Sequence, residues 1–322
     1  MKQMPEKPAE LPDHDRVSAR PAGWQKPQVT VSPRVPRARL FPSLPRWNRL
    51  LGDFVRYALL LLIALICGLP LLWMALNSVK LEPEIWKKPP TFFPQTLTLE
   101  NYRYIFRSTE IPDFVINSIL VSIPTTLLVV LMGASAAYAL ARLDFPGGRW
   151  LSAMAIFCYL IPPILIAIPA VRVISLFQLS GKLIGLIPVY TALFLPFAIW
   201  ILRSYFAGFP LELEDAARVD GATRFQAIYM VVLPQAIPGM IATALFVFNS
   251  AWGEYLFASL LIPSSDQATL SIGIAQLVGR SGQDTFWSVM MAGAIIMVLP
   301  VIGIFILLQR YLVAGWGGGA FK

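Results

Sequence analysis

Hydrophobic residues along this chain gather into long runs instead of alternating regularly with polar ones. Runs of twenty or more residues recur six times, and at about 1.5 Å of rise per residue each can cross a hydrocarbon core of about 30 Å. The pattern predicts helices at roughly 55–78, 114–141, 151–172, 184–205, 237–261 and 288–312. Prolines interrupt several runs, which membrane helices tolerate because neighbouring helices and waters satisfy the freed carbonyls. We therefore expect an all-α membrane protein with six transmembrane helices.

Residues 1–54 have a different character. They contain nine prolines and ten lysines or arginines and show almost no hydrophobic periodicity, a composition typical of disorder. They lack a short apolar core followed by a small-residue cleavage site, so they do not resemble a signal peptide. We expect a disordered, proline-rich, basic tail in the cytoplasm, followed by one membrane domain over 55–322.

Composition supports a membrane protein, because 57% of residues are hydrophobic and only 14% are charged, against about 25% charged in soluble domains. The net charge of +8 would also suit a nucleic-acid-binding protein. Much of the excess lies before the first run, where membrane orientation and anionic lipid account for it. We expect contact with the lipid bilayer and none with nucleic acid. The single histidine, His14, and the cysteines Cys67 and Cys158 indicate neither a metal site nor a disulfide framework.

Basic residues next to the runs indicate how the helices are oriented. Besides those of the tail, bases follow the second, fourth and sixth runs: Arg142, Arg149, Arg203, Arg218, Arg224, Arg310 and Lys322. All of them share one side of the membrane if six helices alternate, so we expect cytoplasmic N and C termini. The loop between the first two runs carries five further bases, offset there by five acids.

One polar segment, residues 211–239, lies between the fourth and fifth runs and is therefore expected in the cytoplasm. Pro210 suits the start of a helix because its missing N–H is not needed there. Acids follow in the first turns, where the helix dipole favours negative charge: Glu212, Glu214 and Asp215. Leu233-Pro234 is expected to close the segment.

Small residues distinguish this segment from an ordinary amphipathic helix lying on lipid. Ala217 and Gly221 are four residues apart, which predicts a low helix face that another surface can approach closely. Glycine inside a helix costs about 1 kcal/mol relative to alanine, so Gly221 indicates a turn or a tight contact. Because three acids would also lie beside an anionic leaflet, a docking element for a cytoplasmic partner explains the segment better.

The same segment carries a family resemblance. The run Glu214-Asp215-Ala216-Ala217, then Asp220-Gly221-Ala222, then Leu233-Pro234 resembles the EAA loop of ABC importer permeases, in which Glu-Ala-Ala is followed by three residues, a glycine and later Leu-Pro. Other stretches are similar to the carbohydrate-uptake branch of that family, the maltose-type G permeases: NSIL at 117–120, LPFAIWILRSYF at 195–206, AWGEYLF at 251–257 and QRYLVAGWGGGAFK at 309–322. The resemblance covers roughly residues 50–322.

The resemblance implies a permease subunit of an ATP-driven importer that translocates a carbohydrate across a bacterial cytoplasmic membrane. The EAA segment would be a coupling helix that inserts into a cytoplasmic ATP-hydrolysing subunit. In the family, the glutamate before the two alanines pairs with a basic residue of that subunit. Asp215 holds this position here and Glu214 precedes it, so both acids are candidates. Gly221 matches the family glycine that bends the segment.

The resemblance also implies partners. These are a second, homologous permease, two copies of the ATPase, and an extracytoplasmic solute-binding protein that contacts loop 262–286, which by itself has the composition of a surface loop. The chain has no G-x-x-x-x-G-K stretch to hold phosphates, so we do not expect an enzyme. ATP and magnesium would bind to the ATPase, and we expect no cofactor in this chain.

The fifth run holds candidates for the substrate path: Asn249, Trp252 and Glu254. An acid at membrane depth costs about 2.5–3.5 kcal/mol on insertion scales, so Glu254 should face protein or a water-filled cavity. Trp252 could stack on a sugar ring while the two polar side chains bond to hydroxyls. Alternatively, Trp252 packs in the bundle and Glu254 braces two helices. Asn117, in the second run, is expected to bond across helices.

Other classes of function are compatible with six apolar runs. A secondary transporter driven by an ion gradient usually has several ionisable residues near mid-span and two recognisable halves. Here Glu254 is nearly the only deep acid, and no half-repeat is visible. A membrane scaffold would not need the EAA segment. An importer is therefore the favoured hypothesis, for a sugar or alternatively for a polyol or glycerol phosphate.

Overall fold

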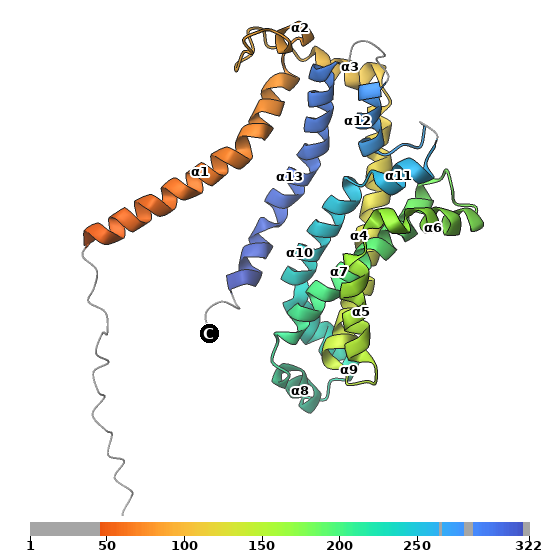
Figure 1. Ribbon diagram of the computed structural model, residues 1–322. Coiled ribbons are helices and arrows are strands. Elements are labelled where there is room, and N and C mark those ends of the chain that lie inside the picture. The colour runs from red at the N-terminus through yellow and green to blue at the C-terminus, as the bar shows by residue number, and fades with distance from the viewer. Residues whose placement is uncertain (1–45, 264–265, 280–285, 318–322) are drawn as a thin grey trace, which may run out of the picture. The chain divides into compact units, whose positions relative to one another are not determined.

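The computed structural model describes the backbone of residues 46–263, 266–279 and 286–317, and within these ranges every regular element is a helix (Figure 1). The chain divides into two compact units, Met1–Leu62 and Ile63–Lys322. Helix α1 (Arg46–Ser78) begins before the predicted start of the first run. The expectation of disorder over 1–54 is wrong for residues 46–54, which form the start of α1. Its remainder, residues 1–45, lies outside the described residues.

Five helices in the described part of the chain are long and apolar enough to cross a membrane: Gly52–Ser78, Ile111–Arg142, Leu183–Ala207, Arg224–Trp252 and Trp287–Tyr311. They overlap, in this order, with α1, α4 (Ile111–Arg142), α7 (Leu186–Ala207), α10 (Leu233–Trp252) and α13 (Trp287–Gly317). A bent helix pair raises the number to six when the pair is taken as one span. The prediction of an all-helical membrane protein is confirmed.

The third predicted run, 151–172, is wrong as a single helix. It forms α5 (Gly148–Leu160) and α6 (Pro163–Leu176), which are bent by 99° relative to each other. Between them Ile161 and Pro162 have extended backbone, with ψ of 123° and 128°. A proline disfavours helical backbone in the residue before it, and here two consecutive residues each precede a proline. The double proline therefore breaks the run, whereas a single one need not.

The fifth predicted run, 237–261, is also wrong at its end. Helix α10 stops at Trp252, and a separate short helix, α11 (Leu256–Leu261), follows it. The carboxylate of Glu254 accepts hydrogen bonds of 3.0 Å from the first-turn N–H groups of α11, those of Phe257 and Ala258. Because such donors have no partner within their own helix, this carboxylate stabilises a new helix start.

Small buried residues bring α4, α7 and α10 together: Ala134, Ala137, Ala198 and Ala236. In membranes, close backbone approach through small side chains is a main source of helix association. Toward one end of these helices larger side chains complete the packing: Tyr138, Leu202, Phe206 and Val232. These three helices form the central core of the larger unit.

Short helices lie at the two ends of this larger unit. At one end are α8 (Glu212–Val219) and α9 (Arg224–Ala227), and toward the other are α2 (Glu82–Ile85), α3 (Glu100–Ser108) and α12 (Leu270–Gly279) (Figure 1). The two groups of short helices therefore lie at opposite ends of the membrane-spanning core.

Polar contacts of Lys80 and Glu84 fix the loop that follows α2. Lys80 is 1% exposed and donates to the carbonyl of Thr91. The carboxylate of Glu84 accepts the Thr91 hydroxyl at 2.9 Å and the Gln95 N–H at 2.8 Å. Burial acts to raise the pKa of Glu84, but these hydrogen bonds and the charges of Lys80 and Lys87 outweigh burial and lower the pKa below its ordinary value of 4.5.

The loop 262–286 is not wholly a surface loop, because it contains α12. Ala268 and Leu270 are fully buried. The Leu270 N–H donates to Ser118 Oγ at 2.8 Å, and Asn117 Nδ2 donates to the Ala268 carbonyl at 3.0 Å. Both partners lie on α4. The sequence predicts that Asn117 bonds across helices, and its partner Ala268 instead lies in the loop just before α12. Residues 264–265 and 280–285 of this loop lie outside the described residues.

Candidate functional site

The polar segment between the fourth and fifth runs begins with α8, an eight-residue helix. The three acids of its first turn occupy positions where the helix dipole favours negative charge: Glu212, Glu214 and Asp215. None of the eight residues is buried. The helix therefore lies on the surface, as a docking element requires.

Two adjacent acids of α8 have different surroundings. Oε1 of Glu214 lies 3.2 Å from Nε of Arg142, and Oε2 accepts the Tyr138 hydroxyl at 3.0 Å. The Glu214 side chain is 13% exposed and that of Arg142 is 4% exposed. Asp215 is instead 71% exposed and pairs with Arg218 at 3.8 Å. An exposed pair of this kind contributes little stability, so the Asp215 carboxylate remains available to a partner.

Gly221 forms the corner after α8. Its φ is +89°, in the left-handed region, and an added Cβ would meet nothing within 4 Å. The Ala222 N–H donates to the Ala217 carbonyl at 3.0 Å, and the Gly221 N–H donates to the Arg218 carbonyl at 3.1 Å. These two bonds define a Schellman motif, a helix end in which glycine is favoured because it adopts a left-handed backbone without strain.

The Schellman motif corrects one sequence prediction. Because α8 ends at Val219, Ala217 and Gly221 do not share a helix face. Of the two explanations offered for the glycine, a turn and a tight contact, the structure shows the turn. Glycine just past the end of a helical pattern is a known stop signal, so the sequence itself contained the signal for this turn.

Beyond the corner, α9 starts at a capping box. The Thr223 N–H donates to Gln226 Oε1 at 2.7 Å, and the Gln226 N–H donates to Thr223 Oγ1 at 3.3 Å. This reciprocal pair satisfies backbone donors that the helix start would otherwise leave free. The corner between α8 and α9 is therefore defined on both sides by local hydrogen bonds.

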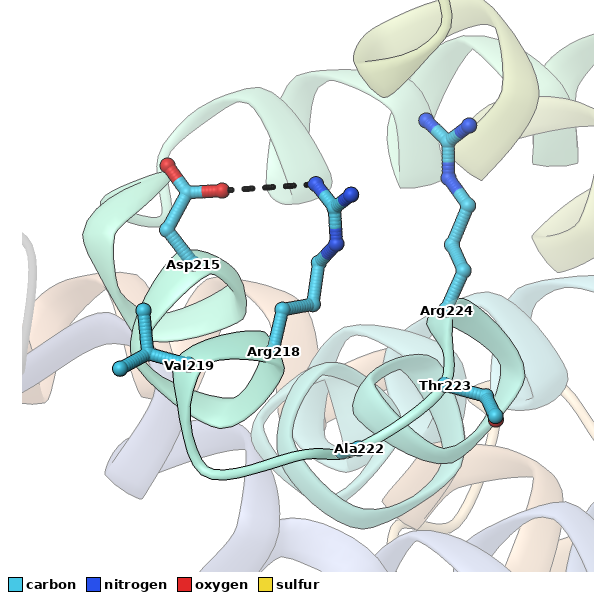
Figure 2. Close-up of a pocket in the computed structure, with 6 residues that line it drawn as sticks. All are labelled: Asp215, Arg218, Val219, Ala222, Thr223 and Arg224. Carbon is cyan, nitrogen blue, oxygen red and sulfur yellow. Dashed lines mark ion pairs between the residues drawn. The ribbon is translucent and has the colours of Figure 1, made fainter.

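A shallow depression opens between the two short helices (Figure 2). It is lined by Asp215, Arg218, Val219, Ala222, Thr223 and Arg224. Figure 2 shows the Asp215–Arg218 pair from α8 on one side and Arg224, from α9, on the other. Val219 at the rim is 87% exposed. The depression thus combines one acid, two bases and an exposed apolar side chain.

Leu233 and Pro234 do not close the segment. They are the first two residues of α10, and the chain stays helical from Arg224 to Trp252. A π-helical turn, Ile228–Val232, precedes them directly. Pro234 has no N–H to donate, and a π turn alters the hydrogen-bond ladder at the place where that donor is missing.

The three substrate-path candidates lie near the end of α10 and differ in exposure. Asn249 is exposed. Trp252 is 1% exposed, and its indole N–H donates to the Met297 carbonyl at 2.9 Å. Glu254 accepts the Tyr190 hydroxyl at 2.6 Å in addition to its two bonds to α11. Trp252 and Glu254 are therefore engaged within the bundle, whereas Asn249 is exposed.

The family of this chain follows from comparison with known proteins. Residues 130–317 match the family described as binding-protein-dependent transport system inner membrane component, and the chain belongs to it. The matched range includes α8, α9 and the corner at Gly221. The resemblance to ABC importer permeases is confirmed, and so is the location in the inner membrane.

Individual relatives agree with this assignment. The chain is 38% identical over 254 residues to the trehalose transport system permease protein of Mycobacterium tuberculosis, covering 79% of this chain and 92% of that protein. It is 32% identical over 271 residues to the trehalose/maltose transport system permease protein of Thermococcus litoralis, covering 81% and 94%. A chain from a bacterial ABC transporter involved in the import of the polysaccharide alginate has the same fold, with a TM-score of 0.69 at 21% identity over 84% of this chain and 99% of that one.

Proposed function

We propose that this chain is a carbohydrate-translocating permease subunit of an ABC importer and that it couples to an ATPase through α8 and the corner at Gly221. Family membership makes it an inner-membrane component of binding-protein-dependent transport, and both relatives described above are named for sugar transport. The proposal includes no catalytic step in this chain. ATP and magnesium bind to the partner subunit.

The coupling assignment rests on the different surroundings of the two acids, Glu214 and Asp215. Asp215 occupies the position directly before Ala216-Ala217 and is exposed, whereas Glu214 is paired inside the chain. Asp215 is therefore the acid that pairs with a base of the ATPase. The depression beside it offers Arg218 and Arg224 to acids of the same partner.

The remaining partners follow from the two ends of the molecule. We place the N and C termini, α8 and α9 in the cytoplasm, where two copies of the ATPase bind. The solute-binding protein then contacts the opposite end through loop 262–286, which contains α12 (Figure 1). A second, homologous permease completes the translocation path. In that path Asn249 contacts the sugar first, because it is exposed, while Trp252 and Glu254 hold the break between α10 and α11.

The test is made on the whole complex purified in lipid, with its binding protein and a panel of trehalose, maltose, a polyol and glycerol 3-phosphate. ATP hydrolysis is measured with and without each compound. We expect stimulation by one of the sugars. Stimulation by the polyol or by glycerol 3-phosphate alone would replace the carbohydrate assignment.

The coupling assignment is tested by Asp215→Ala, with Glu212→Ala as the matched control. Both acids are exposed and lie in the first turn of α8, so each variant removes one surface carboxylate from the same part of the helix. We expect Asp215→Ala to reduce co-purification of the ATPase and stimulated hydrolysis, and Glu212→Ala to reduce neither. Equal behaviour of the two variants would show that Asp215 is not the docking acid.

A further inference from the structure

A partly buried polar cluster joins α8 to the end of α4. Tyr138 and Arg142 lie one turn apart on α4, and both contact the Glu214 carboxylate. Arg142 also donates from Nη2 to the carbonyl of Phe209 at 3.0 Å, in the connection that leads into α8. A single guanidinium thus binds both the helix and the chain segment that precedes it.

This cluster matters because α8 contributes no buried residue to the core. Beside its contacts with α9 and the π turn and its chain connection to α7, α8 is attached to α4 through the Glu214 carboxylate. A partly buried ion pair with added hydrogen bonds tolerates little change in geometry, since moving one partner away leaves the other charge without compensation. Such a cluster stabilises one relative position of the two helices.

Helix α4 also contacts the segment at the opposite end of the membrane-spanning core. It runs without a break from Ile111 to Arg142, about 48 Å at 1.5 Å per residue. Near its other end, Asn117 and Ser118 hold the segment that leads into α12. One rigid helix therefore contacts both the α8 region and the loop assigned to the solute-binding protein.

We propose that Tyr138, Arg142 and Glu214 form a joint that makes α8 and α4 move as one body, so that displacement of α8 by the ATPase reaches the end of the molecule that carries α12. These are positioning residues, which contact neither sugar nor ATPase. The inference rests on the proposed function, because it assumes that the ATPase acts on α8. It assigns Glu214 a role distinct from that of Asp215.

The joint is tested by measuring sugar accumulated per ATP hydrolysed in the complete complex in proteoliposomes. Glu214→Gln keeps the shape of the side chain but removes its charge, and Tyr138→Phe removes one hydroxyl. We expect the ATPase to stay bound in both variants. Sugar transported per ATP should fall by about tenfold in Glu214→Gln and by a smaller factor in Tyr138→Phe, as expected for members of one network.

Controls match each change. Glu212→Gln removes an exposed carboxylate from the same helix turn, and Tyr229→Phe removes an exposed hydroxyl from the π turn. Both should transport as the wild type does. The charge exchange Arg142→Glu with Glu214→Arg should recover part of the coupling that either single change removes, which separates a positioning role from loss of folding.

Two results would overturn the joint. Unchanged transport per ATP in both Glu214→Gln and Tyr138→Phe would show that α8 and α4 do not need the cluster to move together. Loss of the bound ATPase in Glu214→Gln would instead make Glu214 a docking residue. Failure of the proposed function is distinguishable, because it would appear in Asp215→Ala as undiminished ATPase binding.

Discussion

Substitutions of Gly221 test the corner after α8, because its backbone conformation disfavours other residues while the space around it would accept a side chain. Its φ of +89° is left-handed, while an added Cβ would meet no atom of this chain within 4 Å. A side chain therefore costs only backbone strain here, about 1–2 kcal/mol for most L-residues. That corresponds to a factor of about 5 to 30 in the population of the correct turn. Asparagine adopts this conformation more readily than other L-residues.

The assay is stimulated ATP hydrolysis by the complete complex in lipid, for the series Gly221→Asn, Gly221→Ala and Gly221→Val. If the turn conformation is what the partner requires, activity should decrease in the order glycine, asparagine, alanine, valine. The β-branched valine should be worst because it is least tolerant of a positive φ. Co-purification of the ATPase should follow the same order.

Steric exclusion by the partner predicts another order. If the partner packs tightly over the corner, the smallest side chain is tolerated best, and Gly221→Ala should exceed Gly221→Asn. The comparison between asparagine and alanine therefore decides between conformation and space. Alanine equal to or better than asparagine would refute the argument from the Schellman motif.

Three further changes test other parts of the fold. Gly273→Ala places a Cβ against the buried ring of Phe114, and such overpacking should lower the free energy of unfolding by about 1–3 kcal/mol, measured by thermal unfolding in detergent. Tyr190→Phe removes the donor at 2.6 Å from Glu254. A hydrogen bond contributes about 0.5–1.5 kcal/mol net, so the melting temperature of Tyr190→Phe should fall below that of the wild type. The pKa of Glu84 is lowered from 4.5, so its carboxylate stabilises the fold fully above the unfolded-state pKa, and this contribution is lost as pH falls through the lower folded-state pKa. The melting temperature of the wild type should therefore drop on acidification below about pH 5, and that of Glu84→Gln should drop less.

Hydrophobic runs predicted which parts of the chain are helical but not where the helices break. The reason lies in proline, whose effect in a membrane helix depends on its neighbours. Single prolines remain inside long helices at several positions: Pro124, Pro196, Pro238 and Pro300. At 161–163 two prolines in succession impose extended backbone on consecutive residues, and the run splits. The length of a hydrophobic run does not distinguish a single proline from a double one.

The break after α10 depends on side-chain contacts that a local pattern does not contain. From the sequence, Glu254 is a deep acid that requires compensation, and a cavity or a helix contact would equally provide it. In the structure the compensation comes from the Tyr190 hydroxyl and from two backbone N–H groups. These N–H groups have no partner within α11 because they lie at its start. The break between the helices therefore provides donors for Glu254, and Glu254 in turn stabilises the break.

Glu214 and Asp215 show the same limit within the candidate site. Successive residues of a helix point about 100° apart, so one of two adjacent acids can face the bundle while the other faces water. Which one faces inward depends on Tyr138, 76 positions earlier in the chain, and on Arg142. The resemblance to the family identified the turn and its glycine, but both acids fitted the pattern equally. The fold makes one carboxylate paired and largely buried and the other exposed, and this difference makes the two carboxylates experimentally distinguishable.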